Sequence, residues 1–166
     1  GADNFIYGKA PNQFFKSTLV RLDLSGDILL PAEGEGRNAV YAAQQGLSVY
    51  AFDISVAARD KALRLAEENN VEIQYDVGAI TELPLADRVF DAAALIFAHL
   101  PPHIRTDFHR AVADRIKPGG HLIFEGFSKN NLVHRLENPG IGGPDNPAML
   151  FSTAQIRQGH GSGRKL

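Results

Sequence analysis

The residues whose types and spacing could do chemistry are two glycines, Gly34 and Gly36, and two later aspartates, Asp53 and Asp76. The glycines follow an apolar run over 28–30 and precede a helix-like segment, and Asp53 ends the next apolar run. Glycines let the backbone turn sharply and approach a ligand, a helix N-terminus attracts polar groups, and an acid there can accept hydrogen bonds from ribose hydroxyls. This order of strand, glycine turn, helix, strand and acid predicts a site for a nucleotide-containing cofactor.

Five predicted strands must position these residues. Apolar or alternating runs predict strands over 27–31, 47–52, 71–75, 90–97 and 121–127. Because strands alternate with helices, we expect one α/β domain over 1–166, with a three-layer, doubly wound, mostly parallel, Rossmann-like sheet. In such sheets ligands bind at the carboxyl ends of the strands. The residues expected at those ends are Gly34, Asp53, Asp76, His99 and Glu125.

The helices have recognisable beginnings and ends. A helix over 38–45 is expected to stop at Gly46, and Ser55 is expected to cap a helix that ends at Asn69 and Asn70. A third helix should start at the Pro101-Pro102 pair and run to about residue 116, before a tight turn over 117–120.

Two cofactor classes use this layout. The string from Gly34 to Ala39 fits the dinucleotide fingerprint G-x-G-x-x-G/A, and Asp53 lies near the roughly 20-residue spacing expected of its acid. The same residues resemble the first two motifs of the class I S-adenosylmethionine (SAM) methyltransferases. Gly-Glu-Gly-Arg-Asn-Ala is similar to the small-molecule branch that includes tellurite-resistance and thiopurine methyltransferase-like proteins.

Three further strings resemble the methyltransferases. Asp76 and Val77 follow the third apolar segment, Phe90-Asp91 opens a strand that leads to Ala98-His-Leu-Pro101, and Ile116-Lys-Pro-Gly-Gly120 precedes an apolar strand. The resemblance extends from Phe5 to Phe151 and implies SAM as cofactor, with S-adenosylhomocysteine (SAH) as product. We therefore expect a SAM-dependent methyltransferase acting on a small molecule; an NAD-type oxidoreductase and a non-catalytic SAM- or nucleotide-binding module are the alternatives.

The resemblance also implies roles for individual residues. Gly34 and Gly36 would lie along the methionine portion of SAM, Asp53 would bind the ribose, and Asp76 would bind the adenine amine. The alternatives without a ligand are that Gly34 and Gly36 form a plain strand–helix turn, that Asp53 caps the next helix, and that Asp76 is an exposed loop acid. Further cofactor-binding residues are expected at Ile54, Val77 and Phe97.

The chain departs from the usual motif in the loop after the first strand. The family carries an acid at the position of Leu30 and a glycine at that of Ala32. Glu33 is a candidate for the missing carboxylate, pairing with the ammonium or the sulfonium of SAM, or is a solvated loop acid. Arg37 is a candidate for neutralising the SAM carboxylate or an anionic substrate; otherwise it is a surface residue, although an arginine in the first helical turn opposes the helix dipole.

Two segments are candidates for contact with the methyl acceptor. Residues 1–20 form an arm or lid in which Tyr7 and Asn12 belong to a family-like string; packing on the core is the alternative. His99 is the candidate catalytic residue, as general base or substrate contact, or else caps the helix after it. His103 stands four residues on, with two prolines between, and no metal site is predicted.

The amino-acid composition limits the kinds of partner that the protein is expected to bind. The net charge is −2, which gives no electrostatic case for binding nucleic acid or an anionic membrane. No cysteine is present, which fits a cytoplasmic protein without thiol catalysis. The oligomeric state and the acceptor stay open.

The C-terminal part, 128–166, reads as rich in loops, with a last helical turn over 152–158. The related fold has seven strands, so strands six and seven are expected to be incomplete here. A sheet of only five strands would leave strand five as an exposed edge, prone to pairing with another chain. Residues of the natural chain are expected to be missing near 156–160 and after 166.

Overall fold

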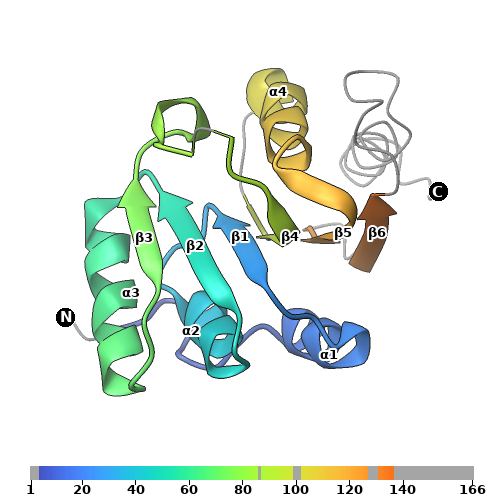
Figure 1. The fold of residues 1–166 in the computed structure, drawn as a ribbon. Coiled ribbons are helices and arrows are strands. Elements are labelled where there is room, and N and C mark those ends of the chain that lie inside the picture. Colours follow the sequence, from blue (N-terminus) through green and yellow to red (C-terminus); the bar gives the residue numbers. More distant parts are fainter. Residues whose placement is uncertain (1–3, 86, 99–101, 127–130, 137–166) are drawn as a thin grey trace.

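The computed structural model describes residues 4–85, 87–98, 102–126 and 131–136 (Figure 1). Within these ranges helices and strands alternate along the chain. The elements are α1 (Gln13–Leu22), β1 (Asp27–Pro31), α2 (Arg37–Gln44), β2 (Ser48–Asp53), α3 (Val56–Glu68), β3 (Gln74–Val77), the 3-10 turn η1 (Ile80–Glu82), β4 (Phe90–Ile96), α4 (Pro102–Ala113), β5 (Ile116–Glu125) and β6 (Asn131–Leu136).

One sheet of six strands runs through the middle of the molecule in the order β3-β2-β1-β4-β5-β6. Its first five strands pair in parallel, and β6 pairs with β5 in antiparallel orientation. The strand order reverses between β1 and β4, which is where doubly wound sheets bind ligands. The predicted α/β, mostly parallel, Rossmann-like architecture is therefore confirmed.

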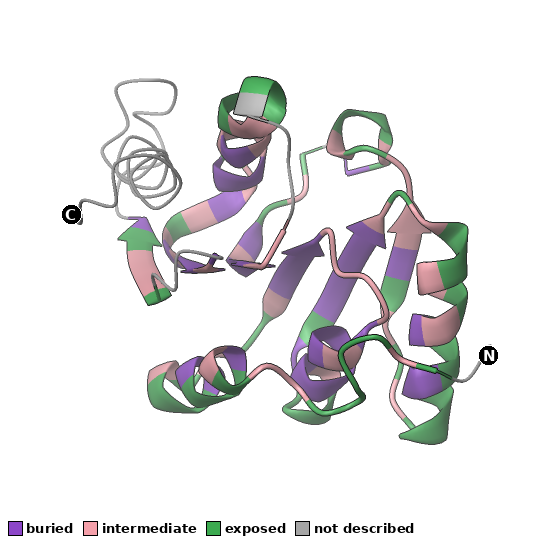
Figure 2. Cartoon of the chain, turned by 180° about the vertical axis from the view of Figure 1, so that it is seen from behind, coloured by how far each residue is buried: buried purple, intermediate pink, exposed green. Residues whose placement is uncertain are grey.

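Helices cover both faces of this sheet. One buried cluster joins Phe15 of α1 and Ala39 of α2 to Ile28 and Leu30 of β1. The opposite face joins Leu29 of β1 to Val112 of α4 and to the segment around η1. The central strands are buried almost throughout (Figure 2), as expected of parallel strands covered on both sides.

Local sequence signals explain where two helices start. Asn12 caps α1 by accepting a 2.9 Å hydrogen bond from the Phe15 N–H, and Ser55 caps α3 through the Ala58 N–H at 3.0 Å. The predicted Ser55 cap is confirmed. Such caps satisfy donors that the first helical turn leaves open.

Several predicted bounds are wrong. β3 begins at Gln74, three residues later than expected, and contains Asp76 rather than preceding it. α4 ends at Ala113, because Ile116 already belongs to β5 and pairs with Phe90. The predicted turn over 117–120 lies inside β5, where the register with β4 shifts between Phe90 and Ala92.

Strand five is not an exposed edge of this sheet. β6 pairs with β5 along its length, from Gly120↔Leu136 to Glu125↔Asn131. Only Leu136 of β6 is buried, so the strand carries no apolar run that sequence patterning could detect. The part 128–166, expected to be rich in loops, therefore contains a strand.

Other expectations fall on residues that the structure does not describe. These are the helical turn over 152–158, residues missing near 156–160 or after 166, and strand seven. Among the helices that are described, none is long and apolar enough to cross a membrane. The described residues also contain no group of three or more His, Cys, Asp or Glu side chains able to hold a metal ion.

Candidate functional site

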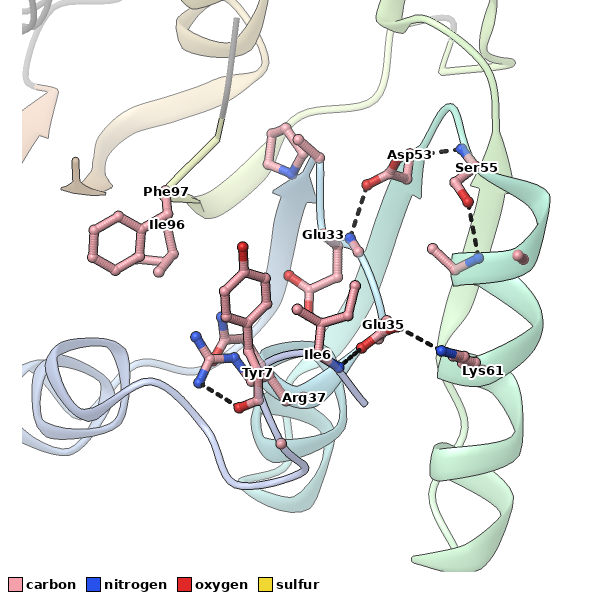
Figure 3. Close-up of a pocket in the computed structure, with 17 residues that line it drawn as sticks. Ile6, Tyr7, Glu33, Glu35, Arg37, Asp53, Ser55, Lys61, Ile96 and Phe97 are labelled. Atoms are coloured by element: carbon pink, nitrogen blue, oxygen red, sulfur yellow. Dashed lines mark hydrogen bonds and ion pairs between the residues drawn. The ribbon is translucent and has the colours of Figure 1, made fainter. Parts of the chain in front are cut away.

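A cavity of about 800 Å³ opens at the carboxyl ends of β1, β2 and β4, where the strand order reverses (Figure 3). Its size lies in the range typical of small-molecule sites. Ile96 and Phe97 lie at one end and Lys61 of α3 at the other. The remaining lining residues are Ile6, Tyr7, Gly8, Pro31, Ala32, Glu33, Gly34, Glu35, Arg37, Asn38, Asp53, Ser55, Ala57 and Ala58.

The loop between β1 and α2 forms the floor of this cavity and is held by neighbouring strands. The Glu33 N–H donates to the Phe52 carbonyl of β2 at 3.1 Å, and the Gly34 N–H donates to Asp53 Oδ2 at 2.9 Å. The Tyr75 hydroxyl of β3 donates to the Gly34 carbonyl at 2.5 Å. The loop is therefore shaped by the sheet before any ligand arrives.

The two glycines of this loop do different things. Gly34 has φ +70° and lines the cavity, and a Cβ there would meet no atom within 4 Å. Gly36 has φ +92° and is buried, and a Cβ there would lie 2.5 Å from the Cβ of Ala62 in α3. Gly34 thus borders the ligand space, whereas Gly36 allows α2 to pack closely against α3.

Asp53 stands at the end of β2 and accepts backbone hydrogen bonds from two sides. Its Oδ2 accepts from the Gly34 N–H, and its Oδ1 accepts from the N–H groups of Ile54 at 2.7 Å and Ser55 at 3.2 Å. The carboxylate joins the glycine loop to the start of α3 while lining the cavity. Oδ2, which accepts one of these hydrogen bonds, has a second lone pair available for a ligand.

Glu33 lies in the cavity wall with its carboxyl group against the first turn of α2. Its Oε2 accepts a 2.7 Å hydrogen bond from the Ala39 N–H. Burial raises the pKa of Glu33 to about 8, against the opposing effects of the Ala39 N–H and of Arg37. The residue keeps partial access to solvent through the cavity, so a ligand there would directly change the surroundings of this carboxyl group.

The N-terminal segment Asn4–Ala10, which we call the strap, reaches the same cavity. Ile6, Tyr7 and Gly8 line it, although the first two side chains are 77% and 71% exposed. The Ile6 N–H donates to Glu35 Oε1 at 2.8 Å, and Lys61 Nζ donates to the Asn4 carbonyl at 2.5 Å. The strap is therefore held by polar contacts and by Phe5, which packs against the cluster of Val40, Leu65 and Ala66.

Arg37 is placed beside the strap. Its guanidinium lies 5.6 Å from the Tyr7 ring centroid, and its Nη1 makes long contacts of 3.5 Å with the carbonyls of Tyr7 and Ala10. Arg37 also lines the cavity (Figure 3). An arginine in this position can serve as a donor to an anionic group within the cavity.

Two non-glycine residues of the cavity wall have a left-handed backbone. Ala32 has φ +50° and Phe97 has φ +53°. Such conformations are unfavourable for residues with a Cβ and are often found at functional sites. The Phe97 N–H donates to the Glu125 carbonyl at 2.7 Å, which ties the end of β4 to β5.

The cavity brings together seven of the predicted site residues: Tyr7, Glu33, Gly34, Arg37, Asp53, Phe97 and, through its packing, Gly36. Asp76 is not among its lining residues. Asp76 instead accepts a hydrogen bond from the Tyr50 hydroxyl, on the face of the sheet opposite Asp53. Ile54 is 80% exposed, and Val77 of β3 lies opposite Asp53 of β2 in the sheet. The Asn12 side chain caps α1. His99 lies outside the described residues.

Sequence reasoning missed Glu35, Lys61 and Asn38. Lys61 Nζ pairs with Glu35 Oε2 at 2.8 Å, and the Asn38 side chain accepts from the Asn12 N–H at 2.8 Å. Lys61 follows Ala57 and Ala58 at helical spacing, so it lies on the same face of α3. That spacing is a signal that could have revealed it.

Solved structures share this fold. The model matches the PH0226 protein from Pyrococcus horikoshii with a TM-score of 0.60 and 24% identity, covering 66% of this chain and 49% of that one. A S-adenosylmethionine-dependent methyltransferase from Clostridium acetobutylicum matches with a TM-score of 0.58 and 19% identity, covering 68% and 48%. TehB from Haemophilus influenzae matches with a TM-score of 0.60 and 16% identity, covering 72% and 42%. The chain thus spans less than half the length of these three structures.

The strand order, and the cavity at the point where it reverses, define a Rossmann-like α/β fold, which these solved structures share. Residues 28–120, more than half of the chain, match the model of the methyltransferase domain family. The chain therefore belongs to the methyltransferase domain family. A comparison with curated proteins found no match.

Proposed function

We propose that this chain binds SAM in the cavity at the ends of β1, β2 and β4 and transfers its methyl group to a small-molecule acceptor. The observation that carries the proposal is the hydrogen bond from the Gly34 N–H to Asp53, together with the open space next to Gly34 within the cavity. Bound there, SAM would supply a methyl group already activated by a positive sulfur. The residues of the chain then have to bind, orient and exclude water.

Individual roles follow from the position of each group. Gly34 would let the methionine portion approach the backbone, and Asp53 would accept hydrogen bonds from ribose hydroxyls. Arg37 would face the cofactor carboxylate, and Glu33 would face its positive charge. Tyr7 and Phe97 would exclude water from the two sides of the cavity.

Other roles are carried over from the family resemblance alone. Asp76 with Val77 would bind the adenine, and Ile54 would lie beside it. His99 would contact the acceptor, and Asn12 would support the lid formed by residues 1–20. In this proposal residues 1–166 form a single domain.

The acceptor class that we favour is a soft nucleophile, such as a thiol or a tellurium or selenium oxyanion. Support comes from the string Gly34-Glu-Gly-Arg-Asn-Ala39, which resembles the tellurite-resistance and thiopurine methyltransferase-like branch. A soft nucleophile needs no base in the transfer step, which agrees with a cavity whose described lining includes no histidine.

Calorimetric titration with SAM, SAH and NAD tests the cofactor. We expect SAM and SAH to bind with one site per chain and NAD to give no heat of binding. Methyl transfer is then assayed with labelled SAM against a panel of thiols, selenite, tellurite, amines and catechols. Tight NAD binding without SAM binding would overturn the proposal, and labelling of amines alone would overturn the acceptor class.

A further inference from the structure

The charges that line the cavity do not balance. Its described lining residues include three acids, Glu33, Glu35 and Asp53, and two bases, Arg37 and Lys61. Glu35 and Lys61 form an ion pair of 2.8 Å, and their side chains are only 16% and 19% exposed. With Glu33 ionised, the remaining three residues carry a formal charge of −1, which suits a ligand with one net positive charge; with Glu33 protonated they carry none, which suits a ligand without net charge.

Glu33 is the acid with the least compensation. Asp53 accepts hydrogen bonds from three backbone N–H groups, whereas Glu33 accepts them from two, those of Ala39 and Asn38. Burying a carboxylate that is only partly compensated is costly, so such a group retains its proton until a positive charge approaches. Burial accordingly raises the pKa of Glu33 to about 8.

Each element around Glu33 contributes a titratable or charged group. Arg37 of α2 lowers the pKa of Glu33, and Asp53 of β2 raises it. Tyr75 of β3 has its own pKa raised, mainly by burial and further by Asp53 and Glu33, so its hydroxyl stays protonated. Glu35, which lies in the same loop as Glu33, forms an ion pair with Lys61 of α3.

SAM and SAH differ by the charge that this site could sense. SAM has a sulfonium, an ammonium and a carboxylate, and is a cation overall; SAH lacks the sulfonium and has no net charge. We propose that Glu33 releases its proton when SAM binds and retains it when SAH binds, so that the cavity distinguishes cofactor from product by charge. This inference rests on the proposed function, because it concerns the same cavity and the same cofactor.

The proposal gives pH a definite effect with a definite sign. Because SAM would bind best to the ionised form of Glu33, its affinity should rise with pH while most molecules still carry the proton. Between pH 6 and pH 7 the gain approaches tenfold, the limit for release of one proton. The affinity for SAH should stay nearly constant, so loss of the product becomes easier relative to SAM as the pH rises.

Proton release can be counted directly by calorimetry at pH 7 in two buffers with different heats of ionisation. We expect close to one proton released per SAM bound and close to none per SAH. Glu33→Gln should abolish the release with SAM and reduce the preference for SAM over SAH. Glu72→Gln is the control: it removes an exposed acid that does not line the cavity, and its proton release should equal that of the wild type.

The outcomes separate this inference from the proposed function. Equal proton release with SAM and SAH, or release that persists in Glu33→Gln, overturns the role of Glu33 while SAM binding itself stands. Failure of SAM to bind overturns both. If Glu33→Gln does not fold, the wild-type counts with the two ligands still decide, because equal counts contradict the proposal and unequal counts support it.

Discussion

The carboxylate of Asp53 accepts a 2.9 Å hydrogen bond from the backbone N–H of Gly34, so the acid after β2 supports the glycine turn after β1. Asp53 ends β2, Gly34 follows the neighbouring parallel strand β1, and both residues line the cavity. A single carboxylate is thereby placed both to shape the loop and to meet a ligand. Any substitution of Asp53 should affect both properties.

Asp53→Ala should weaken SAM binding by roughly 1.5–3 kcal/mol, the usual value of a hydrogen bond to a charged group. It should also lower the free energy of unfolding by about 1–3 kcal/mol, because three backbone donors lose their acceptor. Calorimetry and chemical denaturation measure the two effects. The control is Asp60→Ala, which removes an exposed acid of α3. Unchanged SAM affinity in a folded Asp53→Ala protein would show that the acid only supports the loop.

The two glycines should respond differently to alanine. Gly36→Ala should cost about 2–4 kcal/mol of unfolding free energy, because φ is +92° and the new methyl group would overlap Ala62. Gly34→Ala should cost only about 1–2 kcal/mol, for its backbone conformation alone, since the space beside it is open. Thermal and denaturant unfolding measure this contrast. Equal costs at both positions would mean that Gly36 is not required for packing.

Glu33 should make stability depend on pH. Its carboxyl is harder to ionise in the folded protein, where the pKa is about 8, than in the unfolded chain, where it is about 4.5. The folded state therefore binds more protons between these values, and its stability falls as pH rises from about 4.5 to about 8. The loss is on the order of a few kcal/mol at most.

Comparison with Glu33→Gln isolates this effect. The variant should lose less stability than the wild type between pH 5 and pH 8, as measured by denaturant unfolding without ligand. Glu72→Gln, at an exposed position, should follow the wild type. Parallel pH profiles for the wild type and Glu33→Gln would mean that the buried carboxyl does not titrate in this range.

The strap should control how fast SAM leaves. The chain has no tryptophan, so Tyr7→Trp introduces a single fluorophore at the cavity rim, and its emission should change on SAM binding. In that background Lys61→Met should speed SAM dissociation on the order of tenfold, because contacts with Asn4 and Glu35 worth about 1.4 kcal/mol are lost. Stopped-flow fluorescence measures the rate. Lys9→Met, which breaks an exposed pair with Glu68, should have little effect; equal effects of the two changes would contradict this role of the strap.

Residue patterns predicted the parts of the fold that depend on local signals. The apolar run over 28–30, the Ser55 cap and the glycine turn all identify elements that the structure contains. β6 could not be found this way, because it is half-exposed and depends on pairing with β5. An edge strand of this kind is defined by its pairing with the neighbouring strand rather than by an apolar pattern of its own.

The candidate site likewise contains residues that sequence patterns could identify and residues that they could not. Gly34 and Asp53 were predictable because their spacing reflects two neighbouring strands. The location of Asp76 was not, because its position in β3 directs its side chain to the opposite face, next to Tyr50. The pairing of Lys61 with Glu35 was missed because an ion pair between a loop and a helix leaves no periodic trace, although helical spacing does place Lys61 on the face of α3 that carries Ala57 and Ala58.

The anchored amides of the glycine loop have a consequence for solution dynamics. The N–H groups of Glu33 and Gly34 are bound to Phe52 and Asp53, so they should exchange with deuterium almost as slowly as strand amides, although they belong to a loop. A loop that is already ordered has little conformational entropy left to lose when a ligand arrives. Ligand-induced protection should therefore be concentrated in the strap, while the loop that contacts the ligand most closely should change least.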